Sequence, residues 1–484
     1  MSFYIINKIF KNKIFFYLTT RYLTYILSFV SSMYIAVKLG PYYFGIWAFI
    51  NLLIAVFSNI NFGIANAINI LLVQNKDNKS KCDSYIFNAF ILVFVISLLP
   101  LGVLFYDRLF TIEYFAKYHL GNLIFIVALI IIVGHINTLF SNIFRVKNKI
   151  FEIAFNQSVL SVLIFILMFF ASNRTLLILL TVAYLVANLL SLYLYYRAKT
   201  VVTKGSFDKS LSKNLLTKSL FLFIYNSCFY FIILSTKTLI SYNYTVKEFG
   251  YFAFAFTIAN ASILLLDSFM FLIFPKTIDI LKGTNLLQIK TKIDFFRNNY
   301  ITTIQSIIYL AMPFCFVFIH FFEQYKNSYF SLILIMLTLM LYSNSAGYVN
   351  YLLANNYEKK IAFFAMTALI INIISVLALI KIFKVGFEYC ILGTMITYFV
   401  YTAVIIIFSL KTLKITAFYE TIKEIIPLNI FIPFSVALLL GLTNNINIIW
   451  LPLAVYITLN FNKIIDIFKT LKKLILNPDI INVE

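Results

Sequence analysis

Long hydrophobic runs separated by short polar segments set the pattern of this chain. We identify fourteen candidate spans, at residues 14–37, 43–73, 85–106, 121–144, 155–172, 176–196, 215–240, 250–274, 300–322, 329–353, 361–382, 387–410, 427–443 and 446–462. A helix of about 20 apolar residues crosses a hydrocarbon core of roughly 30 Å. The runs are continuous rather than alternating, which favours helices over a membrane barrel. The pattern therefore predicts an all-α polytopic membrane protein with about 14 transmembrane helices.

Composition agrees with this pattern and excludes a soluble fold. Of the 484 residues, 62% are hydrophobic and only 12% are charged, too few to cover a water-exposed surface. The first run follows three lysines but has no small-residue cleavage site, so we interpret it as a retained span and not a signal peptide. The four cysteines are scattered, which predicts neither a disulfide framework nor a metal site.

The positive charges orient the spans. Of the 39 Lys and Arg residues, 29 lie in segments that face inward if the N-terminus is inside, eight lie in outward loops, and Arg21 and Lys237 lie within spans. This bias predicts that both termini are cytoplasmic. The net charge of +21 also invites a nucleic-acid interpretation, but anionic membrane lipids explain basic loops and no nucleic-acid partner is expected.

A short string recurs along the chain. FGIWAF at residues 44–49 matches FGYFAF at residues 249–254, an offset of 205 residues that is close to the spacing from the first span to the seventh. Six spans per unit predict parallel repeats related by an axis along the membrane normal. We therefore expect two six-helix bundles, at 1–205 and 206–412, followed by two additional helices and a cytoplasmic tail at 413–484. Two unrelated tight turns with similar apolar flanks are the alternative.

Glycine and proline explain the local form of this string. Gly40 is expected to end the first helix in a left-handed conformation, and Pro41 prevents the helix from continuing. Gly45 and Gly250, one in each copy, would let a neighbouring helix approach closely.

Residues 39–68 resemble the first hairpin of Wzx-type polysaccharide flippases, in the superfamily of multidrug, oligosaccharidyl-lipid and polysaccharide exporters. The matching positions are Leu39, Gly40, Phe44, Gly45, Ile46, Trp47 and Ala48, then Phe62, Gly63, Ile64, Asn66 and Ala67. Asn61 stands where that family usually has an acidic residue, so a role that needs a carboxylate there does not carry over.

The resemblance implies a flippase that moves an undecaprenyl-diphosphate-linked oligosaccharide across the bacterial cytoplasmic (inner) membrane by alternating access. Surface polysaccharide, such as the O-antigen of lipopolysaccharide or a capsule, would be the product. Membrane lipids, a polysaccharide polymerase and chain-length machinery would be the partners. The sequence contains no convergent carboxylate pair, nucleophile–base signature or glycine-rich phosphate cradle, so we expect no enzyme activity. No cofactor is expected beyond a coupling proton or sodium ion.

Charged groups within spans are candidates for function because they are costly in lipid. Arg21 suits a diphosphate, which a guanidinium binds bidentately, or it extends to the cytoplasmic headgroups. Asp267, in the eighth predicted span, is expected either to carry a coupling proton or sodium ion or to pair with Lys237. Lys237 in turn either reaches the outer headgroups or contacts substrate.

Neutral polar residues in the spans allow two interpretations. On a continuous helix, Asn59, Asn66 and, less closely, Asn69 share a face that would line a sugar-accepting cavity or hold helices together. His135 and His320 are expected to be packed and hydrogen-bonded rather than to form a proton relay, and neither belongs to a metal-binding pattern.

Two other classes of protein compete with the flippase. An ion-coupled exporter of drugs or small solutes, from the same superfamily, is expected to have twelve spans and an acidic ion site. A membrane polysaccharide polymerase needs catalytic residues on a large outer loop, whereas the longest outward loop here covers only residues 107–120.

Overall fold

The computed structural model describes residues 13–60, 62–110, 112–147, 149–198, 206–261, 280–281, 286–415, 417–443 and 448–476. These residues are helical with short connections, and no strand occurs among them. The chain divides into two compact units, Met1–Ala253 and Phe254–Glu484. The predicted division at residues 205 and 412 rests on the repeat and stays a prediction.

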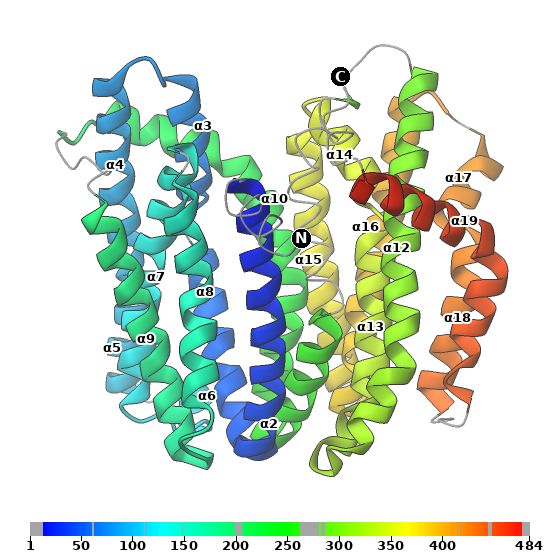
Figure 1. Cartoon of the computed structure of the whole chain (residues 1–484), viewed down its shortest axis with the longest axis horizontal. Coiled ribbons are helices and arrows are strands. Elements are labelled where there is room, and N and C mark those ends of the chain that lie inside the picture. Colours follow the sequence, from blue (N-terminus) through cyan, green and yellow to red (C-terminus); the bar gives the residue numbers. More distant parts are fainter. Residues whose placement is uncertain are drawn as a thin grey trace. The chain divides into compact units, whose positions relative to one another are not determined.

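The first unit consists mainly of nine helices among its described residues (Figure 1). They are α2 (Lys13–Asn59), α3 (Ile64–Gln74), α4 (Lys79–Ser97), α5 (Leu99–Phe110), α6 (Glu113–Ala116), α7 (Leu123–Val146), α8 (Ile150–Leu167), α9 (Asn173–Arg197) and α10 (Lys209–Asn243), and residues 246–253 are also helical. Helix α7 packs against α3, α4 and α9, and α8 packs against α2 and α9. Buried aliphatic and aromatic side chains fill the centre of this unit.

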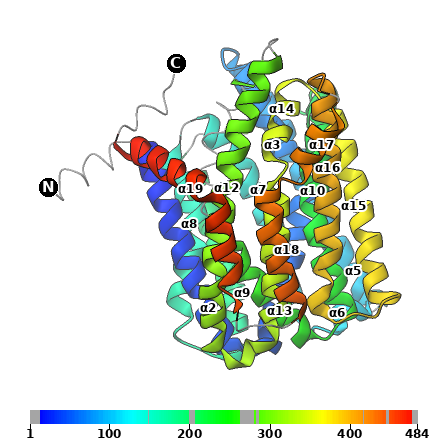
Figure 2. The same cartoon turned by 90° about the vertical axis from the view of Figure 1, so that its right-hand side faces the viewer.

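The second unit is built around α13 (Tyr329–Ser343), nearly all of whose side chains are buried. The other helices are α12 (Leu286–His320), η1 (Glu323–Ser328), α14 (Ala346–Ala354), α15 (Glu358–Lys381), η2 (Phe387–Tyr389), α16 (Ile391–Thr412), α17 (Phe418–Ile425), α18 (Leu428–Thr443) and α19 (Leu451–Leu476). Helices α12, α16 and α18 pack against α13, and α19 packs against α12 and α18. Figure 2 shows the short α17 at the end of α18, beside α16.

The structure confirms an all-α polytopic membrane protein. Among the described residues, nine helices are long and apolar enough to cross a membrane, or ten if the bent pair α17–α18 forms one span. The sequence predicts fourteen. Part of the difference arises because α2 counts once although it holds two predicted spans, and because the predicted span at 250–274 extends beyond the described residues.

Lys117, in the longest predicted outward loop (residues 107–120), binds the C-terminal end of α10. The Lys117 ammonium donates hydrogen bonds to the carbonyl oxygens of Ser241 (2.6 Å), Tyr242 (3.1 Å) and Tyr244. A cation at this position complements the negative end of the helix dipole. Burial lowers the pKa of Lys117, while the nearby Glu248 carboxylate opposes that effect.

Candidate functional site

Arg21 lies on the first arm of α2, between two tyrosines one helical turn away on either side. Its guanidinium donates to the Tyr25 hydroxyl at 2.6 Å, to the Tyr17 hydroxyl at 2.5 Å and to the Gln157 side-chain oxygen of α8 at 3.5 Å. The two tyrosine rings lie 5.4 and 5.8 Å from the guanidinium carbon, within cation–π range. All of these partners are neutral, so they orient the guanidinium without neutralising its charge.

Two further residues near Arg21 were not predicted from the sequence. Arg145, in the last turn of α7, lies close enough to Arg21 and Tyr17 to interact with them electrostatically. In the sequence it is one more basic residue beyond a predicted span, and only packing brings it to α2. Gln157 is a polar residue within the predicted span 155–172, and this was the one feature of the sequence that could have indicated either residue. Two arginines next to each other form a local concentration of positive charge suited to an anion.

The predicted second span is broken, which corrects the expected asparagine face. Helix α2 ends at Asn59, Phe62 and Gly63 adopt left-handed φ angles of 48° and 69°, and α3 begins at Ile64. Asn59 and Asn66 therefore lie on different helices, and the shared face that a continuous helix would give them does not form. Gly63 fits this break because glycine tolerates positive φ. The cavity role of the two asparagines stays a prediction.

Side chains donate hydrogen bonds to backbone carbonyl oxygens just before this break. The Asn59 amide donates to the Ala55 carbonyl at 2.9 Å, and its side chain lies near the Tyr230 hydroxyl of α10. His135, only 3% exposed, places Nε2 3.0 Å from the Phe57 carbonyl oxygen, so the protonated Nε2 donates there. His135 is thus packed and hydrogen-bonded, as expected. The side chain of Asn66 lies outside the described residues.

The two copies of the repeated string contact each other inside the first unit. A Cβ added to Gly45 would lie 2.1 Å from the Val246 carbonyl oxygen, and one added to Gly250 would lie 2.0 Å from the Pro41 carbonyl oxygen. Pro41 and Val246 are themselves 205 residues apart, like the two glycines. The contact is therefore reciprocal, as an approximate two-fold relation between the copies requires. Gly40, with φ 65°, ends the first arm of α2 as predicted.

The remaining predicted site residues are not brought together by the described part of the chain. Lys237 lies within α10 with its side chain partly buried. Asp267, its expected partner, falls outside the described residues, as does the His320 side chain. Among the described residues, no group of three His, Cys, Asp or Glu side chains is placed to hold a metal ion.

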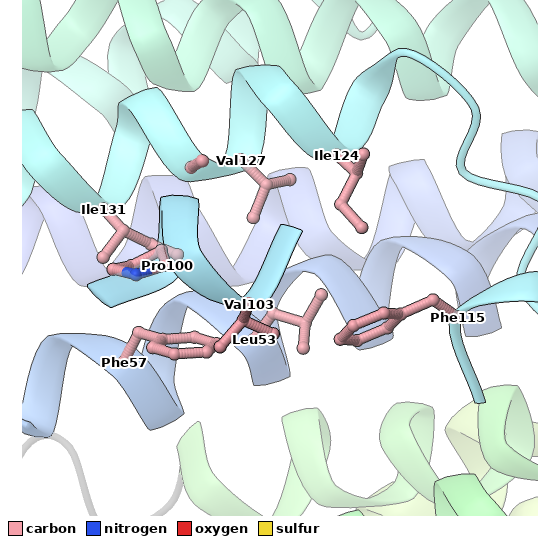
Figure 3. A pocket seen from close by; sticks show the side chains of 9 residues that line it. Leu53, Phe57, Pro100, Val103, Phe115, Ile124, Val127 and Ile131 are labelled. Atoms are coloured by element: carbon pink, nitrogen blue, oxygen red, sulfur yellow. The ribbon is translucent and has the colours of Figure 1, made fainter. Parts of the chain in front are cut away.

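A small apolar crevice opens in the first unit (Figure 3). Nine residues of α2, α5, α6 and α7 line it: Leu53, Phe57, Pro100, Val103, Phe115, Ile124, Val127, Ala128 and Ile131. All of these side chains are hydrocarbon, so the crevice offers no side-chain hydrogen bond to a sugar. Its chemistry therefore differs from that of the Arg21 group.

The second unit contains an ion-pair cluster that was not predicted from the sequence. Arg297 of α12, 5% exposed, contacts the Glu424 carboxylate of α17 at 2.6 Å and donates to the Glu424 main-chain oxygen at 2.8 Å. Lys290 contacts the same carboxylate at 2.8 Å, and the Tyr348 hydroxyl donates to it at 3.0 Å. Burial opposes ionisation of Glu424, but Arg297 and Lys290 outweigh it and hold the pKa of this carboxyl below its usual range.

Comparison with solved structures places the fold among membrane transporters. The lipid II flippase MurJ in an inward closed conformation aligns with a TM-score of 0.65 and 16% identity over 96% of this chain and 99% of that one. An inward-facing multidrug resistance MATE family transporter of the MOP superfamily gives 0.63 and 14%, over 81% and 94%. The eukaryotic MATE transporter AtDTX14 gives 0.51 and 14%, over 84% and 95%. At these identities the likeness establishes the fold alone.

The sequence itself matches a known family. No curated protein sequence matches the chain significantly. The family described as polysaccharide biosynthesis protein, however, matches residues 10–277, which include both copies of the repeated string and the hairpin at 39–68. This match covers more than half of the 484 residues and confirms the resemblance to polysaccharide flippases. The chain therefore belongs to the polysaccharide biosynthesis protein family.

Proposed function

We propose that this protein is a flippase that translocates an undecaprenyl-diphosphate-linked oligosaccharide across the bacterial inner membrane by alternating access. The product would be a surface polysaccharide such as O-antigen or capsule. The observation that carries the proposal is the Arg21 group, in which a guanidinium within a membrane helix is held by neutral partners. Family membership and the fold support a lipid-linked flippase or transporter.

The chemistry of the Arg21 group suits a lipid diphosphate. A guanidinium presents paired N–H donors that match phosphate oxygens, and its pKa keeps it charged at any physiological pH. Arg145 adds a second positive charge nearby. Tyr17 and Tyr25 would contribute hydroxyl groups, and their rings offer surfaces on which a sugar can pack. Asn59, Asn66 and Lys237 remain proposed contacts for the substrate.

The distribution of basic residues supports an orientation with both termini in the cytoplasm. In that orientation Arg21 and Arg145 lie toward the cytoplasmic side, where a substrate made on the inner leaflet would enter. A polymerase and chain-length machinery would then receive the translocated units. A proton or sodium ion is the proposed coupling ion, with Asp267 as its proposed carrier.

An ion-coupled exporter of drugs or small solutes is the second candidate. The fold is compatible with it, since a multidrug resistance MATE family transporter aligns with a TM-score of 0.63, close to the 0.65 of the flippase MurJ. The two functions differ in what the Arg21 group must bind, because a diphosphate needs a cation whereas cationic drugs would be repelled by one.

Replacing Arg21 tests the proposal in cells that depend on this protein for surface glycan. Arg21→Ala should abolish the glycan and leave unpolymerised lipid-linked units on the cytoplasmic leaflet. Arg21→Lys, which keeps the charge but loses the bidentate geometry, should retain part of the activity. Arg197→Ala, at an exposed arginine in the last turn of α9, is the matched control and should behave as wild type.

Normal glycan in the Arg21→Ala cells, with the protein present in the membrane, would contradict the diphosphate role. Units accumulating on the periplasmic leaflet of cells that lack the protein would indicate a polymerase. Unchanged glycan in those cells would favour the exporter of small solutes.

A further inference from the structure

Helix α17 turns its apolar face outward. Phe418 is 80% exposed and Tyr419 is 78% exposed, and Ile422 and Ile426 are also exposed. At about 100° per residue Phe418, Tyr419 and Ile422 fall within one face of the helix, and Ile426 directly follows its last residue. A helix at a water-facing protein surface normally does the opposite and buries such a face.

The opposite face of α17 is attached to the second unit. Glu424 lies on the far side of the helix from Ile422, and it pairs with the buried Arg297 and the partly buried Lys290 of α12. Rotating α17 to cover its aromatic residues would remove the carboxylate from Arg297, which is only 5% exposed. Leaving a buried guanidinium without its counter-charge is strongly unfavourable. The ion pairs therefore fix the outward direction of the apolar face.

The position of α17 in the chain places this face at the edge of a bilayer. The helix connects α16 to α18, and its eight residues are too few to cross a membrane. Leu428, Ile432 and Leu439 of the following helix α18 are also exposed, and at about 100° per residue they share one face of that helix. Figure 2 shows α17 at the end of α18. Lys414 and Lys423 are exposed beside it, where they can reach lipid headgroups.

We propose that α17 is an interfacial helix whose outward face inserts among lipid chains at the headgroup boundary, while Glu424 anchors its inner face to the second unit. The occupant of this face is membrane lipid. A helix with one strongly apolar and one charged face lies in the interface plane in this way. The inference rests on exposure and ion pairing in the second unit and does not depend on the substrate proposed above.

Neighbouring positions on α17 provide a matched pair for a test. Tyr419 belongs to the apolar face, whereas Glu420 points to the other side, and both are exposed. A single nitroxide would be attached at Tyr419→Cys or Glu420→Cys in the full chain, with the four native cysteines replaced by serine. The protein would be reconstituted in vesicles of phosphatidylcholine and phosphatidylglycerol. Collisions with oxygen, which concentrates in lipid, would be compared with collisions with a water-soluble nickel complex.

The proposal expects a several-fold higher ratio of oxygen to nickel collisions at residue 419 than at residue 420. Equal access to nickel at both positions would overturn it by placing α17 in water. Low access to both probes at 419 would overturn it by showing that protein, from this chain or a second copy, covers the face. High oxygen access at both would overturn it by making α17 part of a bent span.

A second pair of variants avoids replacing the cysteines. Tyr419→Trp and Glu420→Trp would be compared in vesicles with and without brominated lipid, which quenches tryptophan at short range. Only the Tyr419→Trp protein should show added quenching beyond that of the native Trp47 and Trp450. Equal quenching of the two variants would again overturn the proposal.

Discussion

Removing the carboxylate of Glu424 should destabilise the second unit more than its position on a short connecting helix suggests. Arg297 keeps two main-chain partners in Glu424→Gln, the carbonyl oxygens of Asn344 at 3.2 Å and of residue 424 at 2.8 Å. It loses the negative charge at 2.6 Å, and Lys290 loses the same charge at 2.8 Å. The guanidinium then keeps hydrogen bonds but loses its ion pair with Glu424, and the nearest remaining carboxylate is that of Asp294, which pairs with Lys290 and interacts with Arg297 electrostatically.

The expected loss follows from how buried each partner is. Breaking a fully buried pair costs about 3–5 kcal/mol. Arg297 is 5% exposed, but Glu424 is 22% exposed and can be partly hydrated. The retained carbonyl bonds reduce the cost further, so we expect ~2–3 kcal/mol for Glu424→Gln. For a unit of this size that corresponds to a melting temperature lower by roughly 5–10 °C, measurable by thermal shift of the purified protein in detergent.

Two variants make this measurement decisive. Glu420→Gln removes a carboxylate from the exposed side of the same helix and should change the melting temperature little. Arg297→Met combined with Glu424→Leu removes both charges and should recover much of the loss, because an apolar pair leaves no buried ion unpaired. If Glu424→Gln melts like Glu420→Gln, the ion pair does not stabilise the unit and the reasoning fails.

The same pair predicts a dependence on pH. Arg297 and Lys290 hold the pKa of Glu424 below its usual range, so its carboxylate contributes stability above the unfolded-state pKa of about 4.3. That contribution should decline as pH falls from 4.3 through the lower folded-state value. The difference in melting temperature between wild type and Glu424→Gln should therefore narrow below about pH 4. A difference that stays constant down to pH 3 would contradict this assignment.

Three further predictions concern the first unit and the proposed ion coupling. Gly45→Ala and Gly250→Ala should each destabilise by about 1–3 kcal/mol, because each added methyl meets a backbone oxygen. The double variant should lose less stability than the sum of the two single losses, since one substitution already opens the shared contact, and additive losses would refute a single contact. The control Gly102→Ala should not destabilise, because a Cβ there has no atom within 4 Å. His135→Leu should lower stability by about 1 kcal/mol through loss of one hydrogen bond to the Phe57 carbonyl, which still accepts from the Ile60 N–H at 2.9 Å, and an unchanged melting temperature would refute this. Asp267→Asn should remove the dependence of transport on an imposed proton or sodium gradient in vesicles, and an unchanged dependence would exclude that role.

The membrane character of the chain and the repeated string could be predicted from the sequence because both are properties of order along the chain. Insertion into lipid depends on the length and apolarity of continuous segments, so runs such as 123–146 reveal a span without any knowledge of its neighbours. Gly40 followed by Pro41 likewise marks the end of a helix through local backbone preference alone. The match between residues 44–49 and 249–254 needed only a comparison of the sequence with itself.

Local preference did not reveal the break in the second span. Phe62 and Gly63 follow a long apolar run, and a single glycine within such a run is also tolerated in a continuous membrane helix. The break is supported from elsewhere, by His135 of α7 and Tyr230 of α10. For this reason the predicted face shared by Asn59 and Asn66 was wrong.

The sequence by itself determined that this is a helical, multi-span membrane protein and pointed to Arg21 and the two glycines as residues of interest. Only the tertiary structure decided what these residues contact. Gln157 reaches Arg21 across 136 residues, Val246 meets Gly45 across 201, and Glu424 reaches Arg297 across 127. Such pairs depend on how helices pack, and helix packing is set by the shapes and charges of whole surfaces that meet in space, which no local stretch of sequence specifies.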